Sequence, residues 1–324
     1  MDQEILVLIE HLRGEVAEIS YVMLAAGRSL AEVTGVTVTA VLLGHESQGL
    51  AVNLAADQVL YLDHVSLAAF TPEVYQNALA QLIRARSPRL VLFGDTSIGV
   101  EVAGSLSVHL ELPLVSNCRT LRADGEALKF VSQVCGGKIM VEGDLPLPTV
   151  LVTIVPGGYK PESGVSPHPP AITSVDFQPA MPARVVLKQY IEPETGDVDI
   201  TKVDLLVAIG RGIQNPDNIE LAEELASALG GVVCASRPVV DQGWLPAARL
   251  VGKSGKRVKP KVYLALGISG APEHTEAITA SGTVIAVNID PNAPIFNLAR
   301  YGVEMDVLDL LPVLTETVLQ QKGR

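Results

Sequence analysis

The feature that most constrains this chain is a regular alternation of short apolar runs, rich in β-branched residues, with longer helix-like stretches. Early runs of this kind lie at residues 5–9, 36–43, 59–62 and 90–93. Before the last of them, Thr71 is suited to cap a helix and Pro72 to occupy its first turn, and an Ala/Leu-rich stretch follows up to Ser87. Strands that alternate with helices predict a parallel sheet covered by helices.

The pattern changes after Leu114, where the spacing favours hairpin strands around Asp124 and Gly125, followed by a strand at 149–154. We therefore expect a first α/β domain over residues 1–155. Residues 156–193 hold eight prolines and show no helical period. Such a composition is typical of extended chain, and it predicts a crossing segment at 156–200.

The alternation resumes beyond this segment, which predicts a second α/β domain over residues 201–324. The expected strands lie at residues 205–209, 232–234, 262–266 and 283–288, and the expected helices at 218–229 and 307–321. Each domain should thus contain a mostly parallel sheet flanked by helices, with the second domain Rossmann-like.

Composition narrows the function classes. The chain has 324 residues, 48% of them hydrophobic, which is enough to bury the cores of two domains. Its apolar runs are far shorter than the roughly 20 residues that cross a bilayer, and the acidic N-terminus does not resemble a signal peptide, so a cytoplasmic location is expected. A formal charge of −12 disfavours nucleic acid as a partner. The three widely spaced cysteines indicate buried thiols rather than a metal site.

One loop of the first domain has the features of a phosphate site. Residues 94–99, Gly-Asp-Thr-Ser-Ile-Gly, follow a strand and open a helix. A glycine and two hydroxyls could cradle a phosphate there, but Thr, Ser and Asp are also ordinary helix caps, and we prefer the capping interpretation.

The second domain offers three such strand ends. They are Gly-Arg-Gly at 210–212, Ala-Ser-Arg at 235–237 and Gly-Ile-Ser-Gly-Ala at 267–271. Because parallel strands end at one edge of a sheet, small residues, hydroxyls and two arginines should converge there. The combination predicts a site for an anionic dinucleotide, although each motif alone is equally compatible with turns and solvated arginines.

Further motifs adjoin these strand ends. They are Val-Val-Asp at 239–241, Val-Gly-Lys-Ser-Gly-Lys at 251–256, Asn-Ile-Asp-Pro-Asn-Ala-Pro-Ile-Phe at 288–296, and, in the first domain, Leu-Val-Leu-Ile-Glu at 6–10 and Phe-Gly-Asp-Thr-Ser at 93–97. Taken together with the strand ends, they resemble the α-subunit of electron transfer flavoproteins over nearly the whole chain.

The resemblance implies FAD bound mainly by the second domain, a β-subunit that completes the site, and electron transfer from flavin dehydrogenases to a quinone reductase or another acceptor. The residues that it places near the phosphate, ribose and adenine portions are Arg211, Ser236, Ser269, Gly270, Ala271, Asn288 and Asp306, with the adjoining Val307. Those that it places at the isoalloxazine or in its loops are Arg237, Val251, Gly252, Lys253, Ser254, Pro272, Glu273 and His274. A guanidinium and an imidazole donor would there favour negative charge on the reduced ring.

This chain departs from the family pattern beside the flavin. It has Lys253-Ser254 where the family usually has Gln-Thr, and Pro272-Glu273-His274 where Ile-Gln-His is usual. Ile289 replaces a common lysine, and the usual Ala-Gly-Met after His274 is absent. An added cation and an added anion predict an altered reduction potential.

Two other function classes remain compatible with the residues. A dinucleotide-dependent oxidoreductase acting on a small molecule would need a general acid, and His274 is the candidate. A nucleotide-binding regulatory module would instead use the first domain and would carry no flavin.

Overall fold

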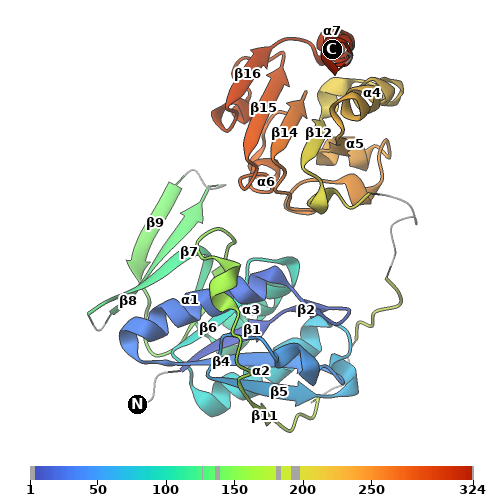
Figure 1. Ribbon diagram of the computed structural model, residues 1–324. Coiled ribbons are helices and arrows are strands. Elements are labelled where there is room, and N and C mark those ends of the chain that lie inside the picture. The colour runs from blue at the N-terminus through green and yellow to red at the C-terminus, as the bar shows by residue number, and fades with distance from the viewer. Residues whose placement is uncertain (1–3, 126, 136–138, 180–183, 191–197, 323–324) are drawn as a thin grey trace. The chain divides into compact units, whose positions relative to one another are not determined.

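The computed structural model describes residues 4–125, 127–135, 139–179, 184–190 and 198–322. The chain divides into two compact units, Met1–Tyr190 and Ile191–Arg324, and each is built on its own sheet (Figure 1). Strands and helices alternate along most of both units. The α/β fold class predicted from the alternating apolar runs is confirmed.

A nine-stranded sheet forms the first unit, in the spatial order β11-β5-β4-β1-β6-β10-β7-β8-β9. Pairings from β11 to β7 are parallel, whereas β8 pairs antiparallel with both β7 and β9. The strands are β1 (Glu4–Ile9), β4 (Thr37–Gly44), β5 (Gln58–Asp63), β6 (Leu90–Gly94), β7 (Leu114–Asp124), β8 (Ala127–Val134), β9 (Ile139–Asp144), β10 (Val150–Ile154) and β11 (Ala171–Ser174). Two short strands, β2 (His11–Leu12) and β3 (Glu15–Val16), follow β1 in the chain and pair antiparallel with each other.

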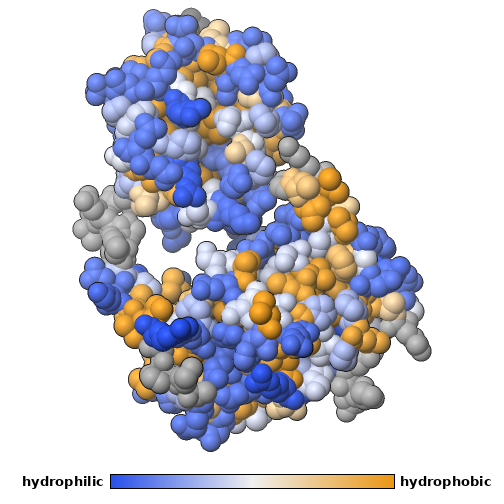
Figure 2. Space-filling view, turned by 180° about the vertical axis from the view of Figure 1, so that it is seen from behind, coloured by the Kyte–Doolittle hydropathy of each residue, from blue (hydrophilic) through white to orange (hydrophobic). Residues whose placement is uncertain are grey.

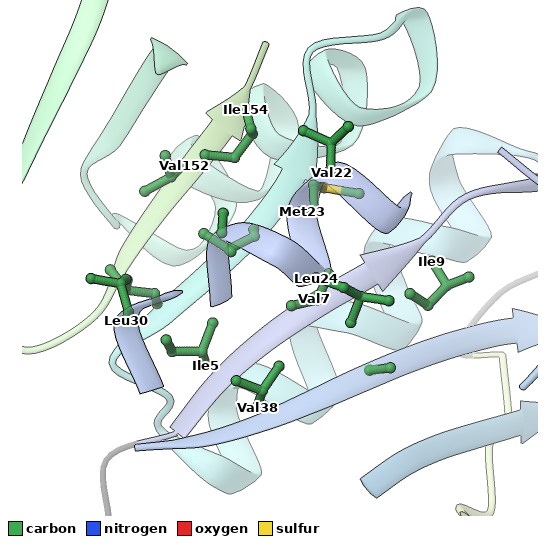
Figure 3. Close-up of a cluster of buried hydrophobic side chains, with 14 of the residues drawn as sticks. Ile5, Val7, Ile9, Val22, Met23, Leu24, Leu30, Val38, Val152 and Ile154 are labelled. Atoms are coloured by element: carbon green, nitrogen blue, oxygen red, sulfur yellow. The ribbon is translucent and has the colours of Figure 1, made fainter. Parts of the chain in front are cut away.

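Successive residues of β1 face opposite sides of this sheet. Ile5, Val7 and Ile9 are buried together with α1 (Glu18–Thr34), and Figure 3 shows side chains of the two elements pointing toward each other. Leu6 and Leu8 are buried in a second cluster with α2 (Pro72–Arg86) and α3 (Ser97–Leu110). Burial on both faces explains why the inner strands have continuous apolar sequences.

The first unit continues past residue 155, where we expected its sheet to end. β11, which lies within the proline-rich residues, pairs in parallel with β5. Phe177 is 3% exposed and belongs to the core cluster of α2 and α3. Without β11, β5 would present unpaired backbone groups at a sheet edge, and the returning segment covers them.

The second unit contains a five-stranded, fully parallel sheet in the order β13-β12-β14-β15-β16. Val207 and Ile209 are buried with α4 and α7 on one face, while Leu206 and Ala208 are buried in a separate cluster on the other. The elements are β12 (Leu205–Ile209), α4 (Ile219–Leu229), β13 (Val232–Ala235), α5 (Arg237–Asp241), β14 (Val262–Leu266), α6 (Pro272–Thr275), β15 (Thr283–Asn288), β16 (Tyr301–Glu304) and α7 (Val307–Lys322).

One cysteine differs from its expected environment. Cys118 and Cys234 are buried, as predicted, but Cys135 is exposed. It follows directly after β8, in the antiparallel part of the sheet, where Ser132 is buried but Val134 is 38% exposed. The expectation that all three thiols are buried is therefore wrong for Cys135, because it follows the exposed end of β8.

The surface is mixed rather than uniformly apolar. On the side seen in Figure 2, hydrophilic residues prevail over the second unit and apolar ones are scattered among them. Among the helices of the described residues, none is both long and apolar enough to cross a bilayer.

Candidate functional site

The carboxyl ends of the strands define one edge of the second sheet, because all of its strands run parallel. The loops that follow β12, β13 and β14 carry the Gly-Arg-Gly, Ala-Ser-Arg and Gly-Ile-Ser-Gly-Ala motifs. The structure thus brings together the three strand ends that the sequence singled out. This is the edge where ligands of open parallel sheets bind.

The loops after β12 and β14 approach each other so closely that only glycine fits. The Gly210 N–H donates to the Leu266 carbonyl at 2.8 Å and that of Gly212 to the Gly267 carbonyl at 3.1 Å. A Cβ on Gly210 would lie 2.2 Å from the Gly267 oxygen. Gly267 itself has a φ of +63°, and a Cβ there would lie 2.6 Å from the Cα of Gly212. The two loops therefore meet through backbone atoms alone, and we call this contact the bare-backbone floor of the site.

Two arginines stand at this edge. Arg211 begins a 3₁₀ turn directly after β12 and is exposed. Arg237 opens α5, and its Nε lies 3.3 Å from the Oδ2 of Asp241 in an exposed ion pair. The hydroxyl-bearing residues differ: Ser236 is buried, and its N–H bonds to the Ile209 carbonyl, whereas Ser269 is exposed.

Three other predicted residues shape the far end of the edge. The Asn288 side-chain amide donates to the Ile268 carbonyl at 2.9 Å, which ties β15 to the loop after β14. The Asp306 carboxylate accepts from the Leu308 N–H at 2.9 Å at the start of α7. Val307 is buried in the core. Asn288 and Asp306 therefore hold loop conformations.

The segment from Leu250 to Lys256 is fixed on both sides. The Val251 N–H donates to the carbonyl of Ala235, at the end of β13, at 2.9 Å. The Lys253 N–H donates to the Glu273 carbonyl, on α6, at 2.7 Å. Between these anchors Gly252 has a φ of +152°, a conformation that favours glycine. Lys253 and Ser254 are exposed.

His274, which the resemblance places at the isoalloxazine, is a buried residue of α6. The residue is 6% exposed, its Nε2 lies 2.9 Å from the Tyr263 hydroxyl, and its Nδ1 lies 3.1 Å from the Val251 carbonyl. Burial lowers the pKa of the ring to about 4. Its neighbours on α6 differ, since Pro272 is half-buried and Glu273 exposed.

Sequence reasoning missed Tyr263. The residue is fully buried in β14, where its hydroxyl meets the imidazole. A tyrosine inside the otherwise apolar run Val-Tyr-Leu-Ala-Leu was the available signal, because a buried hydroxyl needs a hydrogen-bond partner.

The loop at 94–99 of the first unit is a helix cap. The Thr96 hydroxyl accepts from the Gly99 N–H at 2.9 Å, at the start of α3, which confirms the capping interpretation. The same hydroxyl donates to the Glu10 carboxylate at 2.9 Å. Burial raises the pKa of Glu10 to about 7. This contact was not anticipated, since the two residues are far apart in sequence.

Comparison with protein families identifies both units. Residues 5–183 match the electron transfer flavoprotein domain, and residues 199–279 match the electron transfer flavoprotein FAD-binding domain. The second match covers the loops after β12, β13 and β14, together with His274.

Full-length relatives agree with these matches. The electron transfer flavoprotein subunit alpha of Thermoanaerobacterium thermosaccharolyticum is 33% identical, over 99% of this chain and 99% of that protein. Protein FixB of Azotobacter vinelandii is 34% identical, over 98% and 91%. The acryloyl-CoA reductase electron transfer subunit beta of Anaerotignum propionicum is 31% identical, over 99% and 97%. The chain is thus an FAD-binding electron carrier that belongs to the electron transfer flavoprotein α-subunit family.

Proposed function

We propose that this chain pairs with an electron transfer flavoprotein β-subunit and holds FAD along the carboxyl edge of its second sheet. In this complex it passes electrons from flavin dehydrogenases to a quinone reductase or another acceptor. Bound FAD supplies the reversible uptake of electrons, and the chain supplies binding, orientation and local charge. The convergence of the loops after β12, β13 and β14 at one edge is the observation that carries this proposal.

The residues present suit the phosphate side of this cofactor. The close contact of Gly210 with Gly267 fixes the loop that carries Arg211, and the exposed guanidinium of Arg211 offsets phosphate charge in a chain of net charge −12. The Ser269 hydroxyl is exposed beside them. The residues assigned to this side are Arg211, Ser236, Ser269, Gly270, Ala271, Asn288, Asp306 and Val307.

The isoalloxazine side is assigned to Arg237 at the start of α5, to the segment 250–256 and to the residues of α6 that this segment contacts. Arg237 offers a guanidinium there, and the exposed Lys253 and Ser254 offer an ammonium and a hydroxyl. The backbone contacts of Val251, Gly252 and Glu273 shape the same segment, and Pro272 is assigned here as the first residue of α6. A cation beside the ring favours the negative charge that reduction adds to it.

The two rival functions lose their main support. A small-molecule oxidoreductase would use His274 as its acid, yet the ring is buried, both of its nitrogens are engaged, and its pKa is about 4. A nucleotide-sensing first unit would use the loop at 94–99, yet Thr96 there is engaged by Gly99 and Glu10.

Co-expression with the β-subunit tests the proposal. The complex should be yellow and contain FAD, and the isolated chain should bind FAD more weakly. Arg211→Ala should weaken FAD binding by the complex about tenfold, because it removes a charge-assisted contact to phosphate. Lys261→Ala is the matched control, since this exposed lysine pairs with Asp204 at the opposite edge of the same sheet. Equal FAD affinity in the two variants would contradict the placement.

A further inference from the structure

Positive charge is concentrated in the segment that leads into β14 of the second unit. Residues 253–261 contain no acid, and five of the 24 lysines and arginines of the chain fall within them. We call these five residues the basic strip: Lys253, Lys256, Arg257, Lys259 and Lys261. The whole chain carries a formal charge of −12, so the strip is a local reversal of its charge.

Burial alternates along the second half of the basic strip. Arg257, Lys259 and Lys261 are exposed, whereas Val258 is 3% exposed and Pro260 is buried. In extended chain, alternate residues point to the same side and lie roughly 7 Å apart. The two buried residues therefore anchor the segment, and the three cations face solvent.

Backbone hydrogen bonds fix the same segment to the rest of the unit. The Val258 N–H donates to the carbonyl of Ala277, shortly after α6, at 2.9 Å. The N–H of Thr283, the first residue of β15, donates to the carbonyl of Lys261 at 2.9 Å. Because this backbone is already ordered, a partner that binds the strip does not have to order it.

Two exposed members of the strip are not paired with an acid. Lys256 and Lys261 each lie beside an aspartate, with Nζ–Oδ distances of 3.1 Å and 2.7 Å. Within the part of the chain that the structure describes, Arg257 and Lys259 form no ion pair. Their charges therefore remain available to groups outside this chain.

The basic strip begins at the segment assigned to the isoalloxazine. The N–H of Lys253, its first member, is bonded to the carbonyl of Glu273 on α6. From there the chain runs to the start of β14, at the amino edge of the parallel sheet. Two acids, Glu273 and Glu276, adjoin this path, and in the described residues neither forms an ion pair with the strip. The positive surface thus extends from the proposed cofactor site down the side of the unit.

We propose that the basic strip is a docking surface for an acidic protein that exchanges electrons with the flavin of this chain. The inference rests on the proposed function, which puts the isoalloxazine beside Lys253. A protein that exchanges electrons must bring its own cofactor close to the flavin, so the surface around that cofactor comes to lie against the strip. Carboxylates on that surface can pair with Lys259 and, bidentately, with the planar guanidinium of Arg257.

Charge favours a protein over the other anionic partners. Nucleic acid and anionic membranes extend well beyond a strip of five cations, and there they meet the repulsion of a chain with net charge −12. A folded protein can instead confine its carboxylates to the area of contact. Such complementarity raises the rate of association and fixes its orientation.

Electron transfer from an acidic probe protein tests the docking surface. The probe is a flavodoxin hydroquinone, mixed in a stopped-flow instrument with the oxidised, FAD-loaded complex of this chain and its β-subunit. The second-order rate constant should fall as salt rises, because salt screens the attraction of the strip. Arg257→Glu combined with Lys259→Glu should lower the rate constant at low salt about tenfold and remove its fall with salt.

Arg300→Glu combined with Lys322→Glu is the matched control. Both residues are exposed in the second unit and lie outside the strip, and the double change alters the net charge by the same amount. This variant should keep the rate constant within about twofold of the parent. Equal losses in the two double variants would show that net charge alone acts, and would overturn the docking surface. A parent rate constant that rises with salt would overturn it too.

The docking surface and the proposed function fail separately. The FAD content and reduction potential of the strip variant should match those of the parent, and loss of FAD would assign the strip to cofactor binding instead. Binding of ¹⁵N-labelled flavodoxin to the complex, followed by NMR shifts, needs no FAD. If the complex binds no FAD, the proposed function fails, and this titration of the strip and control variants still decides whether the strip binds an acidic protein. Tighter binding of the parent to phosphatidylserine vesicles than to flavodoxin, lost in the strip variant, would assign the strip to a membrane and overturn the choice of partner.

Discussion

The backbone N–H of Lys253 donates to the backbone carbonyl of Glu273 at 2.7 Å. At both positions a charged residue stands where the family usually has glutamine, and the contact places the two backbones side by side. Both side chains are exposed. A cation and an anion introduced at adjacent points of one edge act in opposite directions on any electron-accepting group beside them.

Replacing Lys253 should therefore lower the first reduction potential of the bound flavin. A tenfold change in a one-electron equilibrium corresponds to about 59 mV, and solvent screening should leave an effect on the order of 20–40 mV for Lys253→Gln. Glu273→Gln should raise the potential, and the double variant should lie between the singles. Spectroelectrochemical titration of the complex at low and high salt measures this. A potential within about 10 mV of the parent at low salt would show that Lys253 points away from the ring.

Arg237 should also set the potential, through a guanidinium that the structure shows in an exposed pair with Asp241. Arg237→Ala should lower the potential because it removes a cation, and Arg237→Lys should restore it only in part, since a lysine cannot stack as a planar guanidinium does. Asp241→Asn tests the pairing and should shift the potential upward. The same titration decides the matter, and an unchanged potential in Arg237→Ala would assign the charge stabilisation to another group.

Glu10 should make the stability of the first unit depend on pH. Its pKa is raised from 4.5 to about 7, so the folded unit binds a proton more readily than the unfolded chain. Its contribution is greatest below pH 4.5 and is lost as pH rises to about 7, by up to about 3 kcal/mol. Glu10→Gln should remove this slope. Hydrogen exchange of β1 and β6 between pH 5 and pH 8, corrected for the intrinsic exchange rate, measures the difference, and parallel profiles in parent and variant would contradict it.

His274 should give the second unit the opposite slope. Its pKa falls from 6.5 to about 4, so the unfolded chain binds the proton first. Stability should be complete above pH 6.5 and decline as pH falls toward 4, again by up to about 3 kcal/mol. His274→Asn should flatten this decline. Trp244, the only tryptophan, lies in the second unit, so its fluorescence during urea unfolding reports on this unit. A parent as pH-dependent as the Asn variant would argue against a buried neutral ring.

The inner strands were predictable from the sequence, whereas two strands at sheet edges, β11 and β16, were not. The strands at 205–209, 262–266 and 283–288 have the expected bounds. A strand that is buried on both faces has a continuous apolar sequence, which can be recognised without a structure. β16 and β11 lack such runs, since all four residues of β16 are exposed and β11 has a single partner strand, β5. Their pairing follows from the fold rather than from their composition.

The candidate site was predictable as a set of loops but not in its internal contacts. Parallel topology alone brings the strand ends together, so the motifs at 210–212, 235–237 and 267–271 could be grouped without a structure. The bond between Tyr263 and His274 depends on how α6 packs against the sheet, and the bond between Glu10 and Thr96 depends on the order of β1 and β6. The hydrophobic pattern of a sequence does not determine how a helix packs on a sheet or which strands are neighbours, so it could not predict these two contacts.

The bare-backbone floor at Gly210 and Gly267 separates what can change in this site from what cannot. A side chain at Gly210 or Gly267 would push the two loops apart, so these positions do not tolerate substitution. Lys253 and Glu273 stand on the exposed rim, where one side chain can replace another without disturbing the sheet. Under the proposed function, evolution or an engineer can therefore adjust the driving force for electron transfer at the rim while the docking geometry of the cofactor stays constant.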